Sequence, residues 1–293
     1  MTERERDSYS GYMLTGHQWN GIKEIDSPVN KVVWFFYILA FLVAVLMWIL
    51  LPAFPLGTTF TKGILGIKQD TAINEEIAAG NAKRAGWEKR IRDMSFKDIQ
   101  ADPELMKIVR QTGHTMFGDN CAVCHGLKAT GGPGFPDLVD SSWLWGGTPQ
   151  QVMTTITDGV NSADPDSRSS QMPAFGQDKM LSESDIEKLV PYVHALGSGT
   201  SASEPKEAHQ LFIDNCSACH GEDGKGNTEM GAPNLTDKFW IYGGSEKDIH
   251  RTIWGGRQGL MPSWKERLND VDRKILTLYV LDLPNRSSKA ASK

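Results

Sequence analysis

The sequence predicts an all-α protein with one N-terminal transmembrane helix followed by two tandem helical domains. Three observations lead to this fold class. Residues 32–51 form an uncharged, almost wholly apolar run. An internal repeat covers most of the chain beyond residue 101, and helix-start signals precede each copy without a series of alternating strands. At 293 residues and a net charge of −5, the chain has room for two or three domains.

The apolar run is predicted to span a membrane over residues 32–52. Its twenty residues correspond to about 30 Å of helix at about 1.5 Å per residue. Trp34 and Trp48 lie towards its ends, where interfacial aromatic side chains are common. A cleaved signal peptide is the alternative, but the run is long for one and residues 51–54 offer no small-residue cleavage site. We therefore expect an uncleaved membrane anchor.

All four cysteines lie in two C-x-x-C-H pentapeptides, residues 121–125 and 216–220. Two thiols at this spacing can add to the two vinyl groups of one haem, and the adjacent histidine then becomes the proximal iron ligand. Disulfides and zinc sites also use C-x-x-C, but here a histidine follows directly in both copies. The motifs predict two covalently bound haem c groups, held by Cys121, Cys124 and His125 and by Cys216, Cys219 and His220.

The repeat also supplies a distal ligand for each iron. Met172-Pro173 corresponds to Met261-Pro262, although the first copy has eight more residues between its paired glycines and its methionine. A thioether raises the haem potential into the range useful for electron transfer, and the following proline favours an extended loop. We expect Met172 on the iron of haem 1, opposite His125, and Met261 on that of haem 2, opposite His220. His194 or His250 would replace them in a bis-histidine site.

The domain boundaries follow from these motifs. Asp102-Pro103-Glu104 and Ser203-Glu204-Pro205 are helix-start signals, and a helix, haem loop and closing helix in each copy predict a class I cytochrome c fold. The predicted organisation is a cytoplasmic segment at 1–31, the transmembrane helix at 32–52, a connector at 53–101 with a charged helix over 74–94, cytochrome c domains at 102–197 and 204–284 joined by a linker at 198–203, and a disordered tail at 285–293.

Two further features have more than one interpretation. The extra residues of the first copy fall in a polar loop, 160–171, which is predicted to be a solvated insertion, with a docking surface as the alternative. Aromatic residues precede the paired glycines of each copy and could either line a haem or simply pack in the core. They are Trp143 and Trp145 in the first copy and Trp240 and Tyr242 in the second.

The order of these parts resembles the dihaem subunit of cbb3-type cytochrome c oxidase, the CcoP or FixP family. The haem motifs are common to many cytochromes c. The specific matches are the segment 16–24 (Gly-His-Gln-Trp-Asn-Gly-Ile-Lys-Glu), the end of the span at Leu51-Pro52, and residues 62–66 (Lys-Gly-Ile-Leu-Gly). The chain departs from the pattern at Ile67-Lys68-Gln69, and it has one span where some relatives have two.

The resemblance implies an electron relay rather than an enzyme in its own right. It implies that the chain accepts electrons from a periplasmic donor cytochrome c and passes them towards the monohaem c subunit and the haem–copper catalytic subunit of the oxidase. The single span has no ionisable residue, so it offers no group for proton transfer. Membrane lipid is the other expected partner, and no nucleic acid is expected.

The expected location is the bacterial inner membrane, with the N-terminus cytoplasmic and the haem domains periplasmic. Charge does not decide the orientation, because Lys23 and Lys31 before the span are balanced by Lys62 and Lys68 after it. Haem c attachment decides it, since this reaction takes place outside the cytoplasmic membrane. Alternatives are an anchored dihaem cytochrome that serves another respiratory complex or a dehydrogenase, a dihaem peroxidase, and a haem-based sensor.

Overall fold

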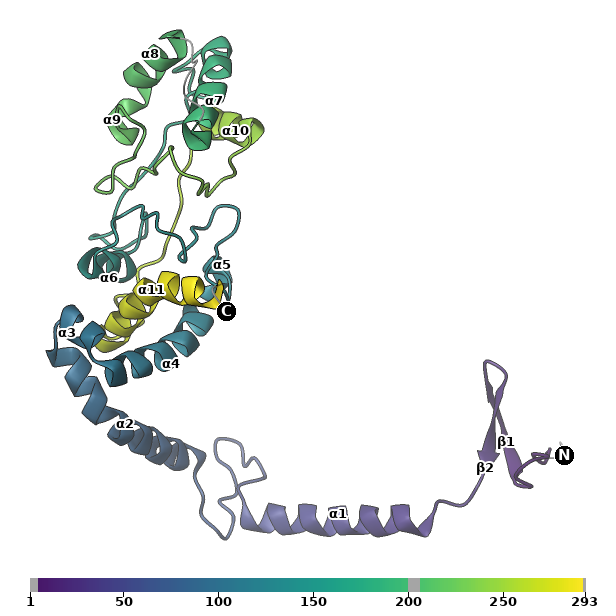
Figure 1. Ribbon diagram of the computed structural model, residues 1–293. Helices are drawn as coiled ribbons and strands as arrows, with labels where there is room; N and C mark the ends of the chain where they lie inside the picture. Colours follow the sequence, from purple (N-terminus) through teal and green to yellow (C-terminus); the bar gives the residue numbers. More distant parts are fainter. Residues whose placement is uncertain (1–4, 200–205, 292–293) are drawn as a thin grey trace. The chain divides into compact units, whose positions relative to one another are not determined.

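The computed structural model describes residues 5–199 and 206–291 (Figure 1). The chain divides into two compact units between Lys83 and Arg84. The N-terminal unit contains a β-hairpin and a long apolar helix, and the C-terminal unit contains both C-x-x-C-H motifs. The described part is mostly helical, as the sequence predicts.

The N-terminal segment contains a β-hairpin that we did not predict. Strand β1 (Met13–Trp19) pairs antiparallel with β2 (Ile22–Asp26), with Trp19 opposite Ile22. The turn residues Asn20 and Gly21 have φ angles of 47° and 88°. Positive φ at both positions is what a two-residue type I′ turn requires, and Asn-Gly is its commonest sequence. This dipeptide is the signal from which the hairpin could have been predicted.

Helix α1 (Lys31–Leu50) is the predicted anchor, and its bounds agree with 32–52 to within two residues. The Asn30 side chain caps its start by accepting a hydrogen bond from the Val32 amide at 3.0 Å. The helix is long and apolar enough to cross a membrane, and none of its residues is buried by the rest of the described chain.

Residues 62–66 fold back on the C-terminal end of α1. The amides of Ile64 and Leu65 donate to the carbonyls of Ile49 and Leu50 at 3.0 Å and 3.1 Å. These bonds satisfy two of the carbonyls that a helix end leaves without an intrahelical partner. Gly63 has a φ of +66°, and a Cβ there would clash with the Leu50 carbonyl. The Lys-Gly-Ile-Leu-Gly stretch therefore caps the anchor helix.

Three helices lead to the first C-x-x-C-H motif. Helix α2 (Gln69–Asp93) contains most of the charged helix predicted over 74–94 but begins earlier, and α3 (Phe96–Ala101) is a short helix. Helix α4 (Pro103–Asn120) begins at the predicted signal, because Asp102 accepts hydrogen bonds from the amides of Glu104 and Leu105 at 2.9 Å and 3.0 Å. This helix start is confirmed.

Together with α4, the remaining helices form two copies of the same four-helix order. The first copy contains α5 (Ala122–His125), α6 (Pro149–Asp158) and α7 (Glu183–Ser198), and the second contains α8 (Lys206–Asn215), α9 (Ser217–His220), α10 (Glu246–Gly255) and α11 (Asp270–Ala291). The second predicted helix start, at 203–205, and most of the linker at 198–203 lie outside the described residues. Helix α7 extends through Ser198, and Gly199 ends it in the left-handed conformation.

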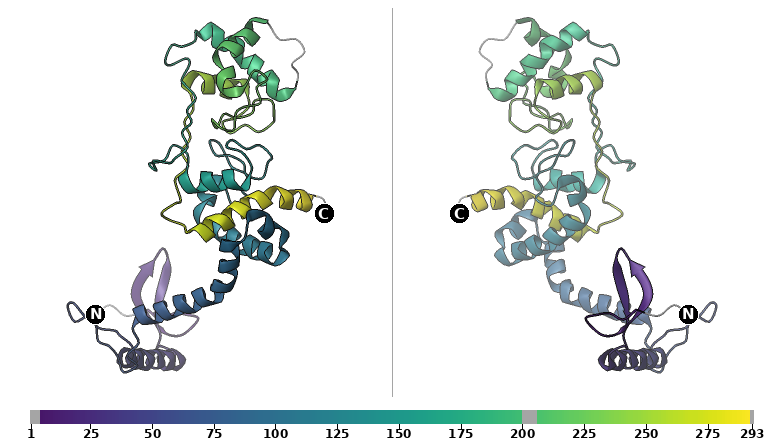
Figure 2. Two further views of the ribbon diagram at one scale, coloured as in Figure 1. Left: turned by 90° about the vertical axis from the view of Figure 1, so that its left-hand side faces the viewer. Right: turned by 90° about the vertical axis from the view of Figure 1, so that its right-hand side faces the viewer.

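The closing helices are exchanged between the two copies. Helix α11, at the end of the second copy, packs on α4 and α6 of the first copy, whereas α7 of the first copy packs on α8 and α10 of the second. We call α4, α5, α6 and α11 the first half, and α7 to α10 the second half. In Figure 2, the segments 160–171 and 257–260 run side by side between the halves.

Each half has its own apolar core. The first core contains Phe117 of α4 with Leu276 and Tyr279 of α11, and the C-terminal part of α2 adds Ile91. The second core contains Phe212 of α8 with Leu189 and Tyr192 of α7. Each core therefore combines an opening helix of one repeat with the closing helix of the other.

The packing halves differ from the contiguous domains predicted at 102–197 and 204–284. The physical reason is that the chain does not turn back after residue 160 or after residue 257. The chain crosses to the other half at both places. The methionine loop and the closing helix of each repeat therefore lie in the half that contains the opening helix of the other repeat. The tail predicted at 285–293 also differs, because α11 continues to Ala291. No glycine in residues 285–291 interrupts it.

Candidate haem sites

The first C-x-x-C-H motif forms a tight helical turn at the end of α4. Cys121 ends that helix, with its amide donating to Phe117 O at 2.8 Å, and the His125 amide donates to Cys121 O at 3.0 Å. Gly126, with a φ of 76°, then ends the turn. The second motif repeats this turn, with the His220 amide donating to Cys216 O at 2.9 Å. Each turn places its two thiols and its histidine on one short segment.

A prolyl carbonyl orients each of the two histidines. Nδ1 of His125 lies 3.0 Å from Pro136 O, and Nδ1 of His220 lies 3.0 Å from Pro233 O. A carbonyl can only accept, so Nδ1 carries the proton and Nε2 keeps its lone pair for a metal. Burial lowers the pKa of both imidazoles and so favours their neutral form, while the hydrogen bonds to the prolyl carbonyls act in the opposite direction. The repeated Pro-x-Leu that supplies these carbonyls was visible in the sequence, but its role was not predicted.

None of the four cysteines forms a disulfide. Burial, with a smaller effect of Cys124, raises the pKa of Cys121 to about 11, and burial with Cys219 does the same for Cys216. A structural zinc site needs four ligands drawn together, whereas each motif offers two thiols and one histidine. Two thiols beside an oriented histidine instead fit the addition of each pair to the vinyl groups of a haem. The donor set therefore fits haem c.

The aromatic residues before the paired glycines contact those glycines. A Cβ on Gly147 would lie 2.7 Å from the Trp143 ring, and a Cβ on Gly244 would lie 2.7 Å from the Trp240 ring. Trp143 packs against the first core and Trp240 against the second. The glycines are needed at these positions because the indole rings occupy the space of a side chain.

The other two aromatic residues, Trp145 and Tyr242, each stack with an arginine whose role was not predicted from the sequence. The Arg168 guanidinium lies over Trp145, 4.9 Å from the ring centroid, and that of Arg257 lies over Tyr242 at 4.6 Å. Arg257 also donates to Thr252 Oγ1 at 2.8 Å. Arg168 Nε, in contrast, is buried without a hydrogen-bond partner. A buried donor of this kind calls for an acceptor, and a haem propionate is an acceptor of the right charge.

The two methionines predicted as distal ligands lie in opposite halves from those expected. Met261 packs against the first core, which also contacts Cys121, and Met172 packs against the second core, which contacts Cys216. The structure therefore does not bring Met172 together with His125, or Met261 together with His220. The reason is the crossing of the chain at residues 160 and 257.

Other candidate ligands have different partners. Met153, another methionine of the first repeat, accepts a hydrogen bond at Sδ from the buried Thr277 hydroxyl at 3.4 Å. His250 stacks on Trp254 with ring centroids 5.9 Å apart. For His194, the other alternative ligand, no contact in the structure indicates a role in binding haem.

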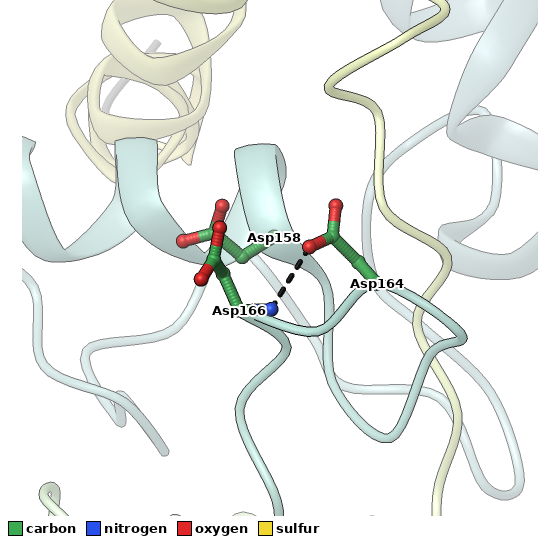
Figure 3. A group of neighbouring side chains, drawn as sticks. All are labelled: Asp158, Asp164 and Asp166. Carbon is green, nitrogen blue, oxygen red and sulfur yellow. Dashed lines mark hydrogen bonds between the residues drawn. The ribbon is translucent and has the colours of Figure 1, made fainter.

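Loop 160–171 is attached to the chain of the second repeat. Its Asp164 and Asp166 lie with Asp158 so that the three carboxylates come within 4.8 Å of one another (Figure 3). Asp164 accepts from the Ser263 hydroxyl at 2.9 Å, and Lys265 donates to Asp166 at 2.8 Å. Hydrogen bonds from the Asp166 amide and the Ser263 hydroxyl lower the pKa of Asp164, whereas burial raises the pKa of Asp158. The loop thus holds residues 263–265 in place.

Comparisons with known proteins match three regions of the chain. Residues 11–58 match the N-terminal domain of cytochrome oxidase-cbb3, FixP, residues 111–197 match cytochrome c, and residues 203–280 match cytochrome C oxidase, cbb3-type, subunit III. The cytochrome c matches are contiguous in sequence, whereas the helices that complete each half are exchanged in space.

Three relatives are similar over almost the whole chain. A cbb3-type cytochrome c oxidase subunit FixP from Bradyrhizobium sp. is 41% identical, covering 95% of this chain and 97% of its own length. FixP from Azorhizobium caulinodans is 40% identical, with 94% of each chain covered. A subunit CcoP from Azospirillum brasilense is 36% identical, covering 97% of this chain and 99% of its own. The chain therefore belongs to the FixP/CcoP family of cbb3-type cytochrome c oxidase subunits.

Proposed function

We propose that this chain carries two covalent haem c groups and relays electrons into a cbb3-type oxidase. One haem is attached at Cys121 and Cys124 and the other at Cys216 and Cys219. His125 and His220 are the proximal ligands, and Met172 and Met261 are the distal ligands. When bound, such haems change between ferric and ferrous iron, which supplies the one-electron chemistry of a relay.

The observation that carries this proposal is the fixed orientation of the two histidines. Each has its Nδ1 directed at a prolyl carbonyl, 3.0 Å away, and its Nε2 left as a donor beside two free thiols. The carbonyl holds the ring and makes Nε2 more basic, which strengthens its bond to iron. The methionines, each followed by proline, are soft neutral ligands suited to a haem that transfers electrons without binding a substrate.

The relay has a donor and an acceptor. A periplasmic cytochrome c delivers electrons, and the monohaem c subunit beside the haem–copper catalytic subunit receives them. Acidic residues outnumber basic ones over the chain, giving a net charge of −5. Haem propionates add negative charge, so the surface suits a basic donor.

Helix α1 anchors the relay in the membrane, with the N-terminus in the cytoplasm and both haems in the periplasm. Its apolar length, and the absence of buried residues along it, support a membrane span. The attachment of haem c outside the cytoplasmic membrane sets its direction. The cytoplasmic segment then includes the hairpin β1–β2.

The test is affinity purification of the full chain from detergent-solubilised membranes. We expect covalent haem c at two groups per chain, together with b-type haem, copper and cyanide-sensitive O₂ uptake. Two haems c without b-type haem, copper or oxidase activity would mean that the chain serves a different respiratory enzyme. A protein without covalently attached haem would contradict the proposed cofactors.

A further inference from the structure

We propose that the relay has a fixed direction, in which a basic donor cytochrome docks on the second half and the first half contacts the oxidase. The haem attached at Cys216 and Cys219 then receives the electron, and the haem attached at Cys121 and Cys124 passes it on. This inference rests on the proposed function, because it requires two haems, a donor and an acceptor. It adds which half each partner contacts.

The first support is the net charge of each half. Residues 172–199 and 206–256 lie between the crossing segments and contain α7 to α10. They have 12 acidic and 7 basic side chains, a net charge of −5. Residues 84–159 and 261–291 contain the helices of the first half, and they have 13 acidic and 14 basic side chains, a net charge of +1. A basic protein is therefore attracted to the second half and not to the first.

The exchange of the closing helices produces this difference. The contiguous repeats, residues 102–197 and 204–284, have net charges of −6 and −3, so the first repeat is the more acidic of the two. Helix α7 brings Glu183 and Asp185 to the second half, whereas α11 brings Arg273 and Lys274 to the first. The folded halves therefore indicate a different entry haem from the one that the charges of the repeats indicate.

The second support lies directly after the two haem attachment motifs. Leu127 and Lys128 follow the first motif, and the equivalent residues after the second are Glu222 and Asp223. All four side chains are exposed. The same two positions thus carry one positive charge at the first motif and two negative charges at the second. A donor must dock close to the haem that it reduces, because the protein contributes by positioning the redox groups.

Two glutamates near the second motif are available for a partner. Asp223 pairs with Lys225 at 2.7 Å, so these two charges cancel. Glu222 and Glu229 are exposed, and neither forms an ion pair with any residue that the structure describes. Met230, next to Glu229 in the chain, is 45% exposed. An apolar contact with a charged rim is the usual composition of a protein interface.

The first motif has a more apolar surface. Three large side chains in or after it are exposed by 90%, 80% and 42%, namely Val123, Leu127 and Phe135. The equivalent residues of the second repeat are Ala218, Glu222 and Ala232. Permanent interfaces are more hydrophobic than transient ones, so this surface fits a partner that stays bound. A neighbouring subunit of the oxidase is such a partner.

The third support is the attachment of the connector. Ile91 of α2 and Ile99 of α3 are fully buried in the first core. Arg90 of α2 also pairs with Asp102, the residue before α4, at 2.5 Å. The end of the connector is therefore part of the first half, and the chain reaches the second half only afterwards. The half that the connector joins is the one suited to a membrane-bound acceptor.

The test compares two charge reversals in the intact oxidase, one near each motif. Glu222 lies two residues after His220, and Asp119 lies two residues before Cys121. Both carboxylates are exposed. The donor probe is mitochondrial cytochrome c, which is a basic protein. The second probe is tetramethyl-p-phenylenediamine, a small reductant that needs no protein docking. O₂ uptake is measured with each probe.

Glu222→Lys should raise the KM for cytochrome c by about threefold or more at low salt, because it repels the donor. It should change oxidation of the small reductant much less, and its KM should depend less on ionic strength than that of the parent. Asp119→Lys is the matched control, with a KM expected within about twofold of the parent. A larger rise for Asp119→Lys, or no rise for Glu222→Lys, would overturn the proposal.

A second measurement needs no variant. A carbodiimide joins lysine amines of the docked cytochrome c to carboxylates of this chain, and mass spectrometry of the peptides identifies those carboxylates. We expect them within residues 206–256, with Glu222 and Glu229 among them. Cross-links that fall mainly on Asp119 and other carboxylates of the first half would overturn the proposed direction.

Failure of the proposed function would give different results. Fewer than two covalent haems per chain would contradict the relay itself. So would an oxidase that oxidises the small reductant but takes no electrons from any cytochrome c. Donor contacts on the first half, in contrast, would leave the relay in place and overturn only its direction.

Discussion

Arg110 and Asp282 join the opening helix of the first repeat to the last helix of the chain. Their two hydrogen bonds, 2.7 Å and 3.1 Å long, span 172 residues of sequence. The Asp282 side chain is 10% exposed, whereas that of Arg110 is 45% exposed. The carboxylate therefore depends on this arginine more than the arginine depends on it.

Arg110→Ala should destabilise the first half by about 1–3 kcal/mol, because it leaves a nearly buried carboxylate without its partner. Guanidinium unfolding of the haem-loaded protein, followed in the Soret band, measures this loss. Lys188→Ala is the matched control, since it removes the more exposed pair with Glu207 and should cost clearly less stability than Arg110→Ala. Equal losses for the two variants would show that burial of Asp282 does not matter.

Gly159→Ala should weaken the hold on Met261. The alanine would have to adopt a φ of +75° and its Cβ would meet the Met261 carbonyl, so we expect a loss of about 2 kcal/mol or more. The ferric thioether-to-iron charge-transfer band of one haem should weaken in the same variant. Gly118→Ala is the control, because Gly118 lies within α4 with no neighbouring atom within 4 Å of a Cβ. That substitution should stabilise the helix by about 0.5–1 kcal/mol.

Arg168→Gln should lower the midpoint potential of one haem. The arginine has a buried Nε without a partner and lies over Trp145, and removing its charge beside a propionate favours ferric iron. Arg257→Gln should have a smaller effect, because Thr252 binds both Nε and Nη2 of that guanidinium, whereas Arg168 is bound only through Nη2, by Gln151 O at 3.2 Å. Spectroelectrochemical titration of both haems measures the shifts. Unchanged potentials in Arg168→Gln would mean that this arginine contacts no propionate.

The sequence predicted the parts that depend on neighbouring residues. The haem motifs, the anchor helix and the Asp102-Pro103 helix start are local signals, and the structure places the last two where they were expected. The hairpin also had a local signal, Asn20-Gly21, which the charged and polar composition of the segment concealed.

The exchange of α7 and α11 could not be predicted from the repeat. The two closing helices have such similar sequence patterns that the contiguous and the exchanged packing place similar residues in each core. Tyr192 and Tyr279 occupy equivalent positions, and each lies beside a phenylalanine and a histidine of an opening helix. Either closing helix can therefore fill either core. What distinguishes them lies outside the repeated residues, in pairs such as Arg110 with Asp282, and these become visible only once the two helices are side by side.

Asp140 should make stability depend on pH in a direction opposite to that of most carboxylates. Burial raises its pKa from 3.8 to about 6, and the nearby charges of Asp137 and Asp237 act in the same direction, while the Ser142 amide opposes them. The folded protein therefore keeps a proton that the unfolded chain has lost between about pH 4 and pH 6. The contribution of this residue to stability is complete below about pH 4, falls as the pH rises through this window, and stays at its lowest value above it.

Asp140→Asn removes this penalty while keeping an oxygen that can accept from the Ser142 amide, now at 2.8 Å. Because the carboxyl is partly exposed, we expect a gain of only about 1 kcal/mol at about pH 7 after allowance for solvent screening. Near pH 4 the gain should be much smaller, since Asp140 is then protonated in the folded protein and about half protonated in the unfolded chain. Unfolding free energies of the variant and the parent are compared at both pH values, so that the titration of other carboxylates cancels. A gain of the same size at both would mean that the ionisation of Asp140 is not its source.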